Sequence, residues 1–241
     1  MSSTVNQSNL EPMWPTLVAL VAAGALYAAL PSELALDGSR WQILALVAGV
    51  LLPAEFFHAF GKHLGCRICG YLAISIVTAS MIHSVIRLVE AIPKHCVPAE
   101  NLLSSAIILW ITNVLVFAAW YWRLDAGGPH KRNAQDEHKD GAFLFPQMTI
   151  PAEPTSTEGK LCRECSASKV TISQAAVPVE RKESWSPRFI DYLFLAFNTS
   201  TALSPTDVPV LSRWAKVLMM IQALISMSVV VLLAARAVNI L

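Results

Sequence analysis

The stretch FNTSTALSPTDVPVLSRWAKVLMM, Phe197 to Met220, decides the fold. Its first half is crowded with polar side chains, and a strongly apolar segment begins in its second half. The hydroxyls and the carboxyl group belong to Thr199, Ser200, Thr201, Ser204, Thr206 and Asp207. Pro205 and Pro209 forbid one continuous helix through the junction. The stretch therefore predicts a short helix, an irregular polar strand and then a long helix.

The composition of the chain is that of a membrane protein. Of its 241 residues, 54% are hydrophobic and 15% are charged, whereas an ordinary soluble domain has about 25% charged residues. The net charge of +1 provides no strong basic field, so we expect no nucleic-acid partner. The chain contains no Gly-rich phosphate loop and no dinucleotide fingerprint. We therefore predict no cofactor and no enzymatic activity.

Apolar runs of about 20 residues, the length that crosses a bilayer, recur along the chain. Four come early, at 14–30, 41–60, 69–92 and 102–122, and a fifth covers 210–240. A shorter apolar run at 189–203 precedes the fifth. We predict an all-α, polytopic membrane helix bundle with five transmembrane helices. The run at 189–203 is predicted to be a short re-entrant helix before the last span, similar to a pore helix.

Changes in composition divide the chain into four parts. Residues 1–13 form a polar N-terminal tail, and 14–122 form a four-helix transmembrane region. Residues 123–188 read as a long polar loop, partly disordered, with an apolar island, FLFPQM (143–148), predicted to dock on the membrane face. Residues 189–241 comprise the pore-loop-like helix, the polar strand and the final transmembrane helix.

The distribution of Lys and Arg indicates an orientation in the plasma membrane. Lys62 and Arg67 follow the second span, and Arg123 and Lys131 follow the fourth. Because basic residues accumulate on the cytoplasmic side, we expect a multi-pass protein with its N-terminus and long loop in the cytoplasm.

The segment YLFLAFNTSTALSPTDVPVLSRWAKVLMMIQALIS, residues 192–226, resembles the pore helix, filter and inner helix of potassium channels. Residues 201–207, TALSPTD, fall against the filter sequence T-T-V-G-Y-G-D. The resemblance implies a homo-oligomer in which 210–240 lines a central axis and an inorganic cation passes. It gives the six polar residues between Thr199 and Asp207 the role of pore-lining or filter residues.

The whole chain resembles more closely the uncharacterised bacterial integral membrane proteins of the DUF1345 type. These proteins share several helical spans, an aromatic end to the fourth span, here FAAWYWRLDAGGP, and a DYLFLAF…SPTD stretch before the last helix. This resemblance covers most of the chain and implies no established activity.

The filter-like segment departs from the potassium-channel pattern at three positions. Ser204 and Thr206 replace the two glycines, and Pro205 replaces the tyrosine. Glycine permits the left-handed backbone that aims carbonyls inward, whereas Pro205 fixes its own φ and restricts the residue before it. The departures argue against a potassium-selective filter and leave two alternatives open, a less selective pore or a relic that no longer conducts.

The predicted orientation also differs from that of potassium channels. The distribution of Lys and Arg would bring the helix at 189–203 in from the cytoplasm, whereas potassium channels insert the pore helix from outside. Three explanations stay open: the orientation is reversed, 189–203 crosses as a thin span, or the analogy fails.

Polar residues within the spans have two readings. His83, Asn113 and Gln222 are candidates for a cavity or a proton relay. The alternative is that Asn113, Gln222 and nearby Ser226 hydrogen-bond across helices, and that His83 is a satisfied interior residue. The hydroxyl-rich stretch has the same alternative of helix packing, with Asp207 as the N-cap of the last helix.

Four of the five cysteines form two Cys-x-x-Cys pairs, Cys66/Cys69 and Cys162/Cys165. Together they are weak candidates for a Cys₄ zinc site. A redox pair and unligated thiols are the alternatives.

The predicted function is that of a channel-like integral membrane protein, a weakly selective cation pore formed by an oligomer. Its predicted partners are the lipid bilayer, an inorganic cation and further copies of itself. Two alternatives stay open: a non-conducting membrane scaffold or interaction protein, and a thiol- or zinc-dependent membrane sensor or enzyme.

Overall fold

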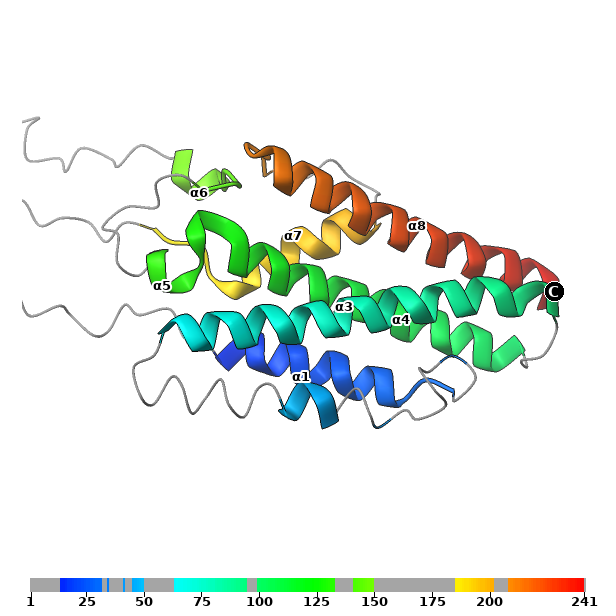
Figure 1. Ribbon diagram of the computed structural model, residues 1–241. Coiled ribbons are helices and arrows are strands. Elements are labelled where there is room, and N and C mark those ends of the chain that lie inside the picture. Colours follow the sequence, from blue (N-terminus) through cyan, green and yellow to red (C-terminus); the bar gives the residue numbers. More distant parts are fainter. Residues whose placement is uncertain are drawn as a thin grey trace, which may run out of the picture.

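The helices of this protein form an elongated bundle (Figure 1). The computed structural model describes residues 14–31, 34, 41, 45–49, 63–94, 99–132, 141–149, 185–201 and 208–240. The regular elements in these ranges are all helical, and this confirms the all-α fold class. They are α1 (Trp14–Ala28), α3 (His63–Lys94), α4 (Ala99–Leu124), η3 (Asp125–Gly127), α5 (Pro129–Arg132), α6 (Pro146–Thr149), α7 (Phe189–Thr201) and α8 (Arg213–Ile240).

Three helical segments are long and apolar enough to cross a membrane. They are Arg67–Ala91 in α3, Asn101–Gly127 in α4 and η3, and Arg213–Ala235 in α8. Helix α1 is apolar but has 15 residues, fewer than a straight span needs. Most of the predicted span at 41–60 lies outside the described residues. The structure therefore supports a membrane helix bundle, and the number of five spans stays a prediction.

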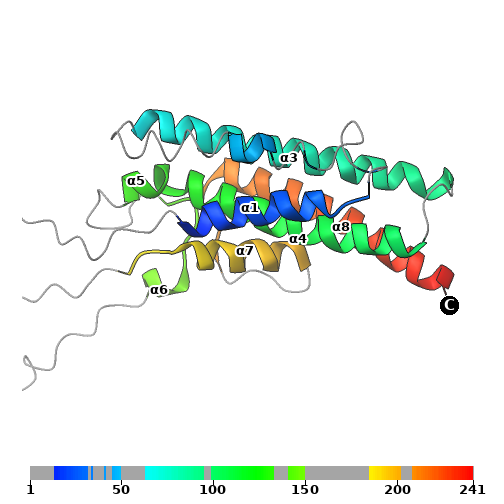
Figure 2. The ribbon, with the colours of Figure 1, turned by 90° about the horizontal axis from the view of Figure 1, so that it is seen from below.

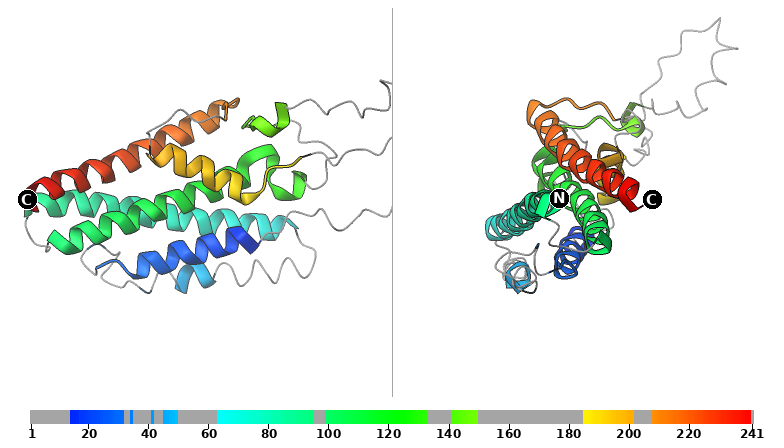
Figure 3. Two further views of the ribbon diagram at one scale, coloured as in Figure 1. Left: turned by 180° about the vertical axis from the view of Figure 1, so that it is seen from behind. Right: turned by 90° about the vertical axis from the view of Figure 1, so that its right-hand side faces the viewer.

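Helix α4 is the central element of the bundle. It contacts α1, α3, α7 and α8, and the views from below and from the end show these helices around it (Figures 2 and 3). The buried share of the span is 61% in α4 and 17% in α8. Buried alanines on α4, Ala106, Ala118 and Ala119, let the neighbouring backbones approach closely.

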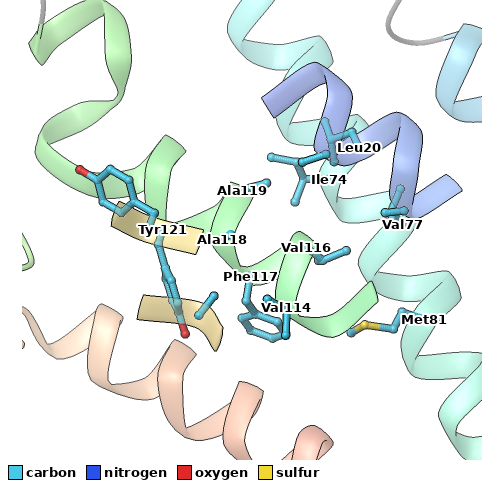
Figure 4. Close-up of a cluster of buried hydrophobic side chains, with 14 of the residues drawn as sticks. Leu20, Ile74, Val77, Met81, Val114, Val116, Phe117, Ala118, Ala119 and Tyr121 are labelled. Carbon is cyan, nitrogen blue, oxygen red and sulfur yellow. The ribbon is translucent and has the colours of Figure 1, made fainter. Parts of the chain in front are cut away.

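The two sides of α4 bury different kinds of side chain. On one side, Leu20 of α1 packs with Ile74 and Val77 of α3 in an apolar core (Figure 4). On the other side, Tyr121 of α4 points toward α7 and α8 (Figure 4). The side of α4 that faces α7 and α8 is therefore the one that carries polar contacts.

Side-chain hydrogen bonds cap the N-termini of the last two helices, α7 and α8. At α7, the side chain of Asp191 accepts the backbone N–H of Arg188 at 2.7 Å, as in half of a capping box. At α8, the hydroxyl of Ser212 accepts the N–H of Ala215 at 3.3 Å. Ser212 is thus the N-cap of α8, whereas Asp207, named as the cap in the packing alternative, lies outside the described residues.

The beginning of the predicted loop folds back against the bundle through Asp125. This residue is fully buried, and its carboxyl oxygens accept the N–H of Ala142 at 2.5 Å and the hydroxyl of Tyr192 at 2.6 Å. Arg132 donates to the carbonyls of Trp122 and Asp125 at 2.7 and 3.0 Å. Asp125 therefore connects the end of α4 to the apolar island and to α7.

The apolar island packs on the helices themselves rather than on the membrane face. Phe143 and Phe145 are buried. The ring of Phe143 lies 5.3 Å from that of Tyr121, and the ring of Phe145 lies 5.4 Å from that of Tyr192, both edge to face. Pairs of this kind add about 0.5–1.5 kcal/mol to the stability gained from apolar burial.

Substitution Tyr192→Phe tests the hydrogen bond to Asp125. It removes a buried donor while keeping the ring contacts, so we expect a loss of about 1–3 kcal/mol in the free energy of unfolding. Unfolding of the purified protein by denaturing detergent measures this loss. Tyr71→Phe is the matched control, because the Tyr71 hydroxyl makes one long bond, 3.3 Å, to the carbonyl of Arg123. An equal effect of both substitutions would contradict the central role of Asp125.

Candidate functional site

Helix α7 begins at the end of the bundle where α4 ends. The ring of Phe189, its first residue, lies 6.2 Å from that of Trp122, and Tyr192 donates to Asp125. After residue 208 the chain is again at this end. Val210 pairs with Phe143 in an isolated β-bridge, and Leu211 donates its N–H to the carbonyl of Ala142 at 2.8 Å. Both flanks of the segment 189–210 therefore contact the loop that follows α4.

The other end of α7 lies far along α8. Ser200 contacts Gln222 and Ser226, which follow the start of α8 by 9 and 13 residues. At 1.5 Å per residue, these contacts lie about 14 and 20 Å from that start. A hydrocarbon core is about 30 Å thick, so the C-terminus of α7 is level with the middle of the α8 span.

A group of buried polar residues, here called the polar cluster, surrounds this C-terminus. Its members are Asn113, Tyr121, Thr199, Ser200, Gln222 and Ser226. The side-chain oxygen of Gln222 accepts the hydroxyl of Tyr121. Its side-chain nitrogen donates to the Ser200 hydroxyl at 2.7 Å and to the carbonyl of Ala196 at 2.8 Å. One amide therefore connects α4, α7 and α8.

The carbonyls at the end of α7 also receive hydrogen bonds. The last four carbonyls of a helix have no partner within it. The carbonyl of Ser200 accepts the hydroxyl of Ser226 at 2.5 Å, and that of Asn198 accepts the hydroxyl of Thr201 at 3.0 Å. The short helix can therefore end inside the bundle, with hydrogen bonds to these carbonyls.

Two polar atoms near this end have no hydrogen-bond partner among the described residues. They are the side-chain oxygen of Asn113 and the indole nitrogen of Trp110. The Asn113 amide donates to the carbonyl of Gln222 at 3.4 Å, and the ring of Trp110 lies 5.8 Å from that of Phe197 on α7. One acceptor and one donor thus remain available beside the C-terminal half of α7.

The structure brings together part of the predicted site. Thr199 and Ser200 are buried, and Thr201 is half-buried. Asn113, Gln222 and Ser226 hydrogen-bond across helices, as the packing alternative predicts. Within the described part of the chain, half-buried His83 forms no hydrogen bond with the cluster. Ser204, Thr206 and Asp207 lie outside the described residues.

Sequence reasoning missed the roles of Tyr121, Asp125 and Tyr192. Tyr121 stands in an aromatic run that indicates a membrane interface, and Asp125 stands in a polar loop. The spacing of Tyr192, Ala196 and Ser200 does place them on one face of a helix. This face is the one that contacts α4 and α8.

Of the four cysteine candidates, Cys69 is the one whose side chain the structure describes. Cys69 has a free, half-buried thiol on α3. The side chain of Cys66 and both Cys162 and Cys165 lie outside the described residues. Among the residues that are described, no group of three or more His, Cys, Asp or Glu side chains is placed to hold a metal ion.

The fold defines the chain as an all-helical protein with three helices able to cross a membrane and a half-length helix packed between two of them. No family model, curated protein or solved structure matches it. Its resemblance to DUF1345-type proteins and to potassium channels therefore stays a prediction.

Substitution Gln222→Met tests the cluster. Methionine keeps the length of the side chain but leaves the Tyr121 hydroxyl without its acceptor and the Ser200 hydroxyl without a donor. We expect a loss of about 1–2 kcal/mol in the free energy of unfolding in detergent. Ser228→Ala is the control, because the exposed Ser228 hydroxyl bonds within its own helix, to Leu224, and its loss should change stability by less than about 0.5 kcal/mol. Equal effects would contradict a stabilising role of the cluster.

Proposed function

We propose that this chain is one subunit of an oligomeric pore-loop channel that passes small inorganic cations with weak selectivity. In this proposal α7 is a re-entrant helix, and residues 202–207 return from the middle of the membrane to the side on which α7 enters. The protein is a multi-pass component of a bacterial plasma membrane and has five spans.

The observation that carries the proposal is the path of the segment 189–210. Its two flanks hydrogen-bond to the loop after α4, and its middle reaches Gln222 and Ser226. Irregular backbone at such depth is tolerated where it is buried in protein or lines water. This path supports a re-entrant loop over a thin span, because a spanning helix would place its two flanks at opposite ends of the bundle.

The electrostatics of α7 favour a cation at its C-terminus. The carbonyl end of a helix carries a partial negative charge, and here it lies level with the middle of the α8 span. The residues that follow supply the hydroxyls of Ser204 and Thr206 and the carboxyl group of Asp207. Oxygen atoms of this kind replace the water shell of a permeating ion.

Helix α8 offers a surface for further copies of the chain. Its inward face carries fully buried residues, Ala215, Gln222, Ser226 and Val229. Its outward face exposes Met220, Leu224, Met227 and Val231, which recur with the i, i+4, i+7 period of one helical stripe. In the proposed oligomer this stripe contacts neighbouring subunits around the pore axis.

A non-conducting scaffold remains the second candidate, and one observation favours it. The hydroxyls of Thr199 and Ser200, both expected to line a pore, are buried and bond within a single chain. A channel must therefore use residues beyond Thr199 and Ser200 to contact the ion.

Thiol labelling from one side of the membrane tests the re-entrant path. Single cysteines replace Arg188, Leu211 and Asn101 in a chain whose five native cysteines are changed to serine. We expect an impermeant maleimide to label Arg188→Cys and Leu211→Cys in the same preparation, either intact cells or inside-out vesicles, and to label Asn101→Cys, at the opposite end of α4, in the other preparation. Labelling of Arg188→Cys and Leu211→Cys from opposite sides would contradict a re-entrant α7. The side that reacts also decides the orientation.

Ion flux into liposomes tests conduction. The purified oligomer should pass K⁺ and Na⁺ at similar rates, because the filter-like segment lacks the two glycines of a potassium filter. Asp207→Asn should change the ratio of the two rates, whereas Ser228→Ala should leave it unchanged. An intact, folded oligomer that passes neither ion would favour the scaffold.

A further inference from the structure

A small cleft with a basic lining lies at the end of the bundle where α3 begins and α4 ends. It is formed by Arg67 and Tyr71 of α3, Arg123 of α4, Lys131 of α5 and the turn at 127–129. Three of these side chains are cationic, and none of the lining residues that the structure describes is acidic. Its volume is about 20 Å³, about the space that one water-sized group needs.

Arg123 is held firmly in this cleft. The residue is 7% exposed, and its guanidinium lies 5.3 Å from the centre of the Tyr71 ring. Tyr71 in turn stacks on Trp120 at 6.1 Å. Gly70 provides the space, because a Cβ at this position would overlap the guanidinium of Arg123. A guanidinium fixed in this way loses little conformational entropy when it binds a ligand.

The turn after α4 brings a third cation to the cleft. Gly127 and Gly128 have φ values of 77° and 94°, in the region that favours glycine. A Cβ on Gly127 would lie 2.5 Å from the Cδ atom of Lys131. The two glycines therefore let the chain reverse direction so that Lys131 lies near Arg123.

The cleft lies at the edge of the apolar spans. Arg67 is the first residue of the α3 span, and Gly127 is the last residue of the span that contains α4. The phosphate groups of phospholipids lie just outside the hydrocarbon core. The three cations are therefore at the depth at which lipid phosphates lie.

We propose that this cleft binds the phosphate group of an anionic phospholipid. Arginine side chains match phosphate oxygens with paired N–H donors, and basic sites between transmembrane helices bind acidic headgroups. A cleft of this volume admits one phosphate oxygen and leaves the rest of the headgroup at the surface. A zwitterionic lipid carries the same phosphate, but its quaternary ammonium is repelled by the three cations. This inference rests on the membrane location and is independent of conduction.

Lipid titration of the purified full-length protein in neutral detergent tests the proposal. The midpoint of thermal unfolding is measured with increasing phosphatidylglycerol, with phosphatidylcholine of the same acyl chains, and with inorganic phosphate. We expect phosphatidylglycerol alone to raise the midpoint. The double substitution Arg67→Gln/Lys131→Gln should weaken its apparent affinity about tenfold or more.

The matched control removes two basic residues elsewhere. Arg213 and Lys216 are exposed at the start of α8, and Arg213→Gln/Lys216→Gln should leave the affinity unchanged. If the double variant of the cleft does not fold, Lys131→Gln alone, at an exposed position, repeats the test. Equal losses in both double variants would overturn the proposal in favour of diffuse attraction. An equal response to phosphatidylcholine, or to inorganic phosphate alone, would overturn the assignment to an anionic lipid.

Discussion

A helix that ends in the interior of a bundle must find hydrogen-bond donors for its last carbonyls, and at the C-terminus of α7 the donors come from α8 and from α7 itself. The hydroxyl of Ser226 donates a hydrogen bond to the carbonyl of Ser200, and the hydroxyl of Thr201 donates one to the carbonyl of Asn198. Gln222 adds a bond to the Ser200 hydroxyl and accepts the hydroxyl of Tyr121. Without such partners, each buried carbonyl would destabilise the fold by about 1–3 kcal/mol.

The two ends of α7 are held by different chemistry. At the C-terminus, neutral amides and hydroxyls form the bonds, within an otherwise apolar bundle. At the N-terminus, the carboxyl group of Asp125 accepts hydrogen bonds from the Tyr192 hydroxyl and the N–H of Ala142. The guanidinium of Arg132 lies 5.4 Å from the centre of the Tyr192 ring. Charged groups are far less costly near the ends of a span than at its centre. This difference is consistent with α7 entering from the end of the bundle and stopping midway.

The helices of this fold were largely predictable, whereas their contacts were not. Apolar runs of about 20 residues identified α3, α4 and α8, because length and hydropathy are properties of a single segment. Pro205 and Pro209 separated α7 from α8 for the same reason. The docking of Phe143 and the central role of Asp125 depend on residues distant in sequence, so no local pattern reveals them. The N-cap of α8 was not predictable in the same way, because Asp and Ser are both good capping residues and no local pattern decides between Asp207 and Ser212.

The prediction of the candidate site was partial for a related reason. Asn113, Gln222 and Ser226 stood out because polar residues are rare inside spans, and each of them is buried where α4 meets α7 and α8. Tyr121 did not stand out, because aromatic residues are common at the ends of spans. Its ring lies within an aromatic run, and the structure shows its hydroxyl bonded to Gln222.

The last turns of α4 carry contacts of three kinds on different faces. Tyr121 faces the polar cluster, Arg123 lines the basic cleft beside Tyr71, and Asp125 follows in the loop that connects to α7. Five consecutive residues therefore belong to one rigid helical end. The backbone that holds Arg123 in the basic cleft therefore also holds Tyr121 against Gln222.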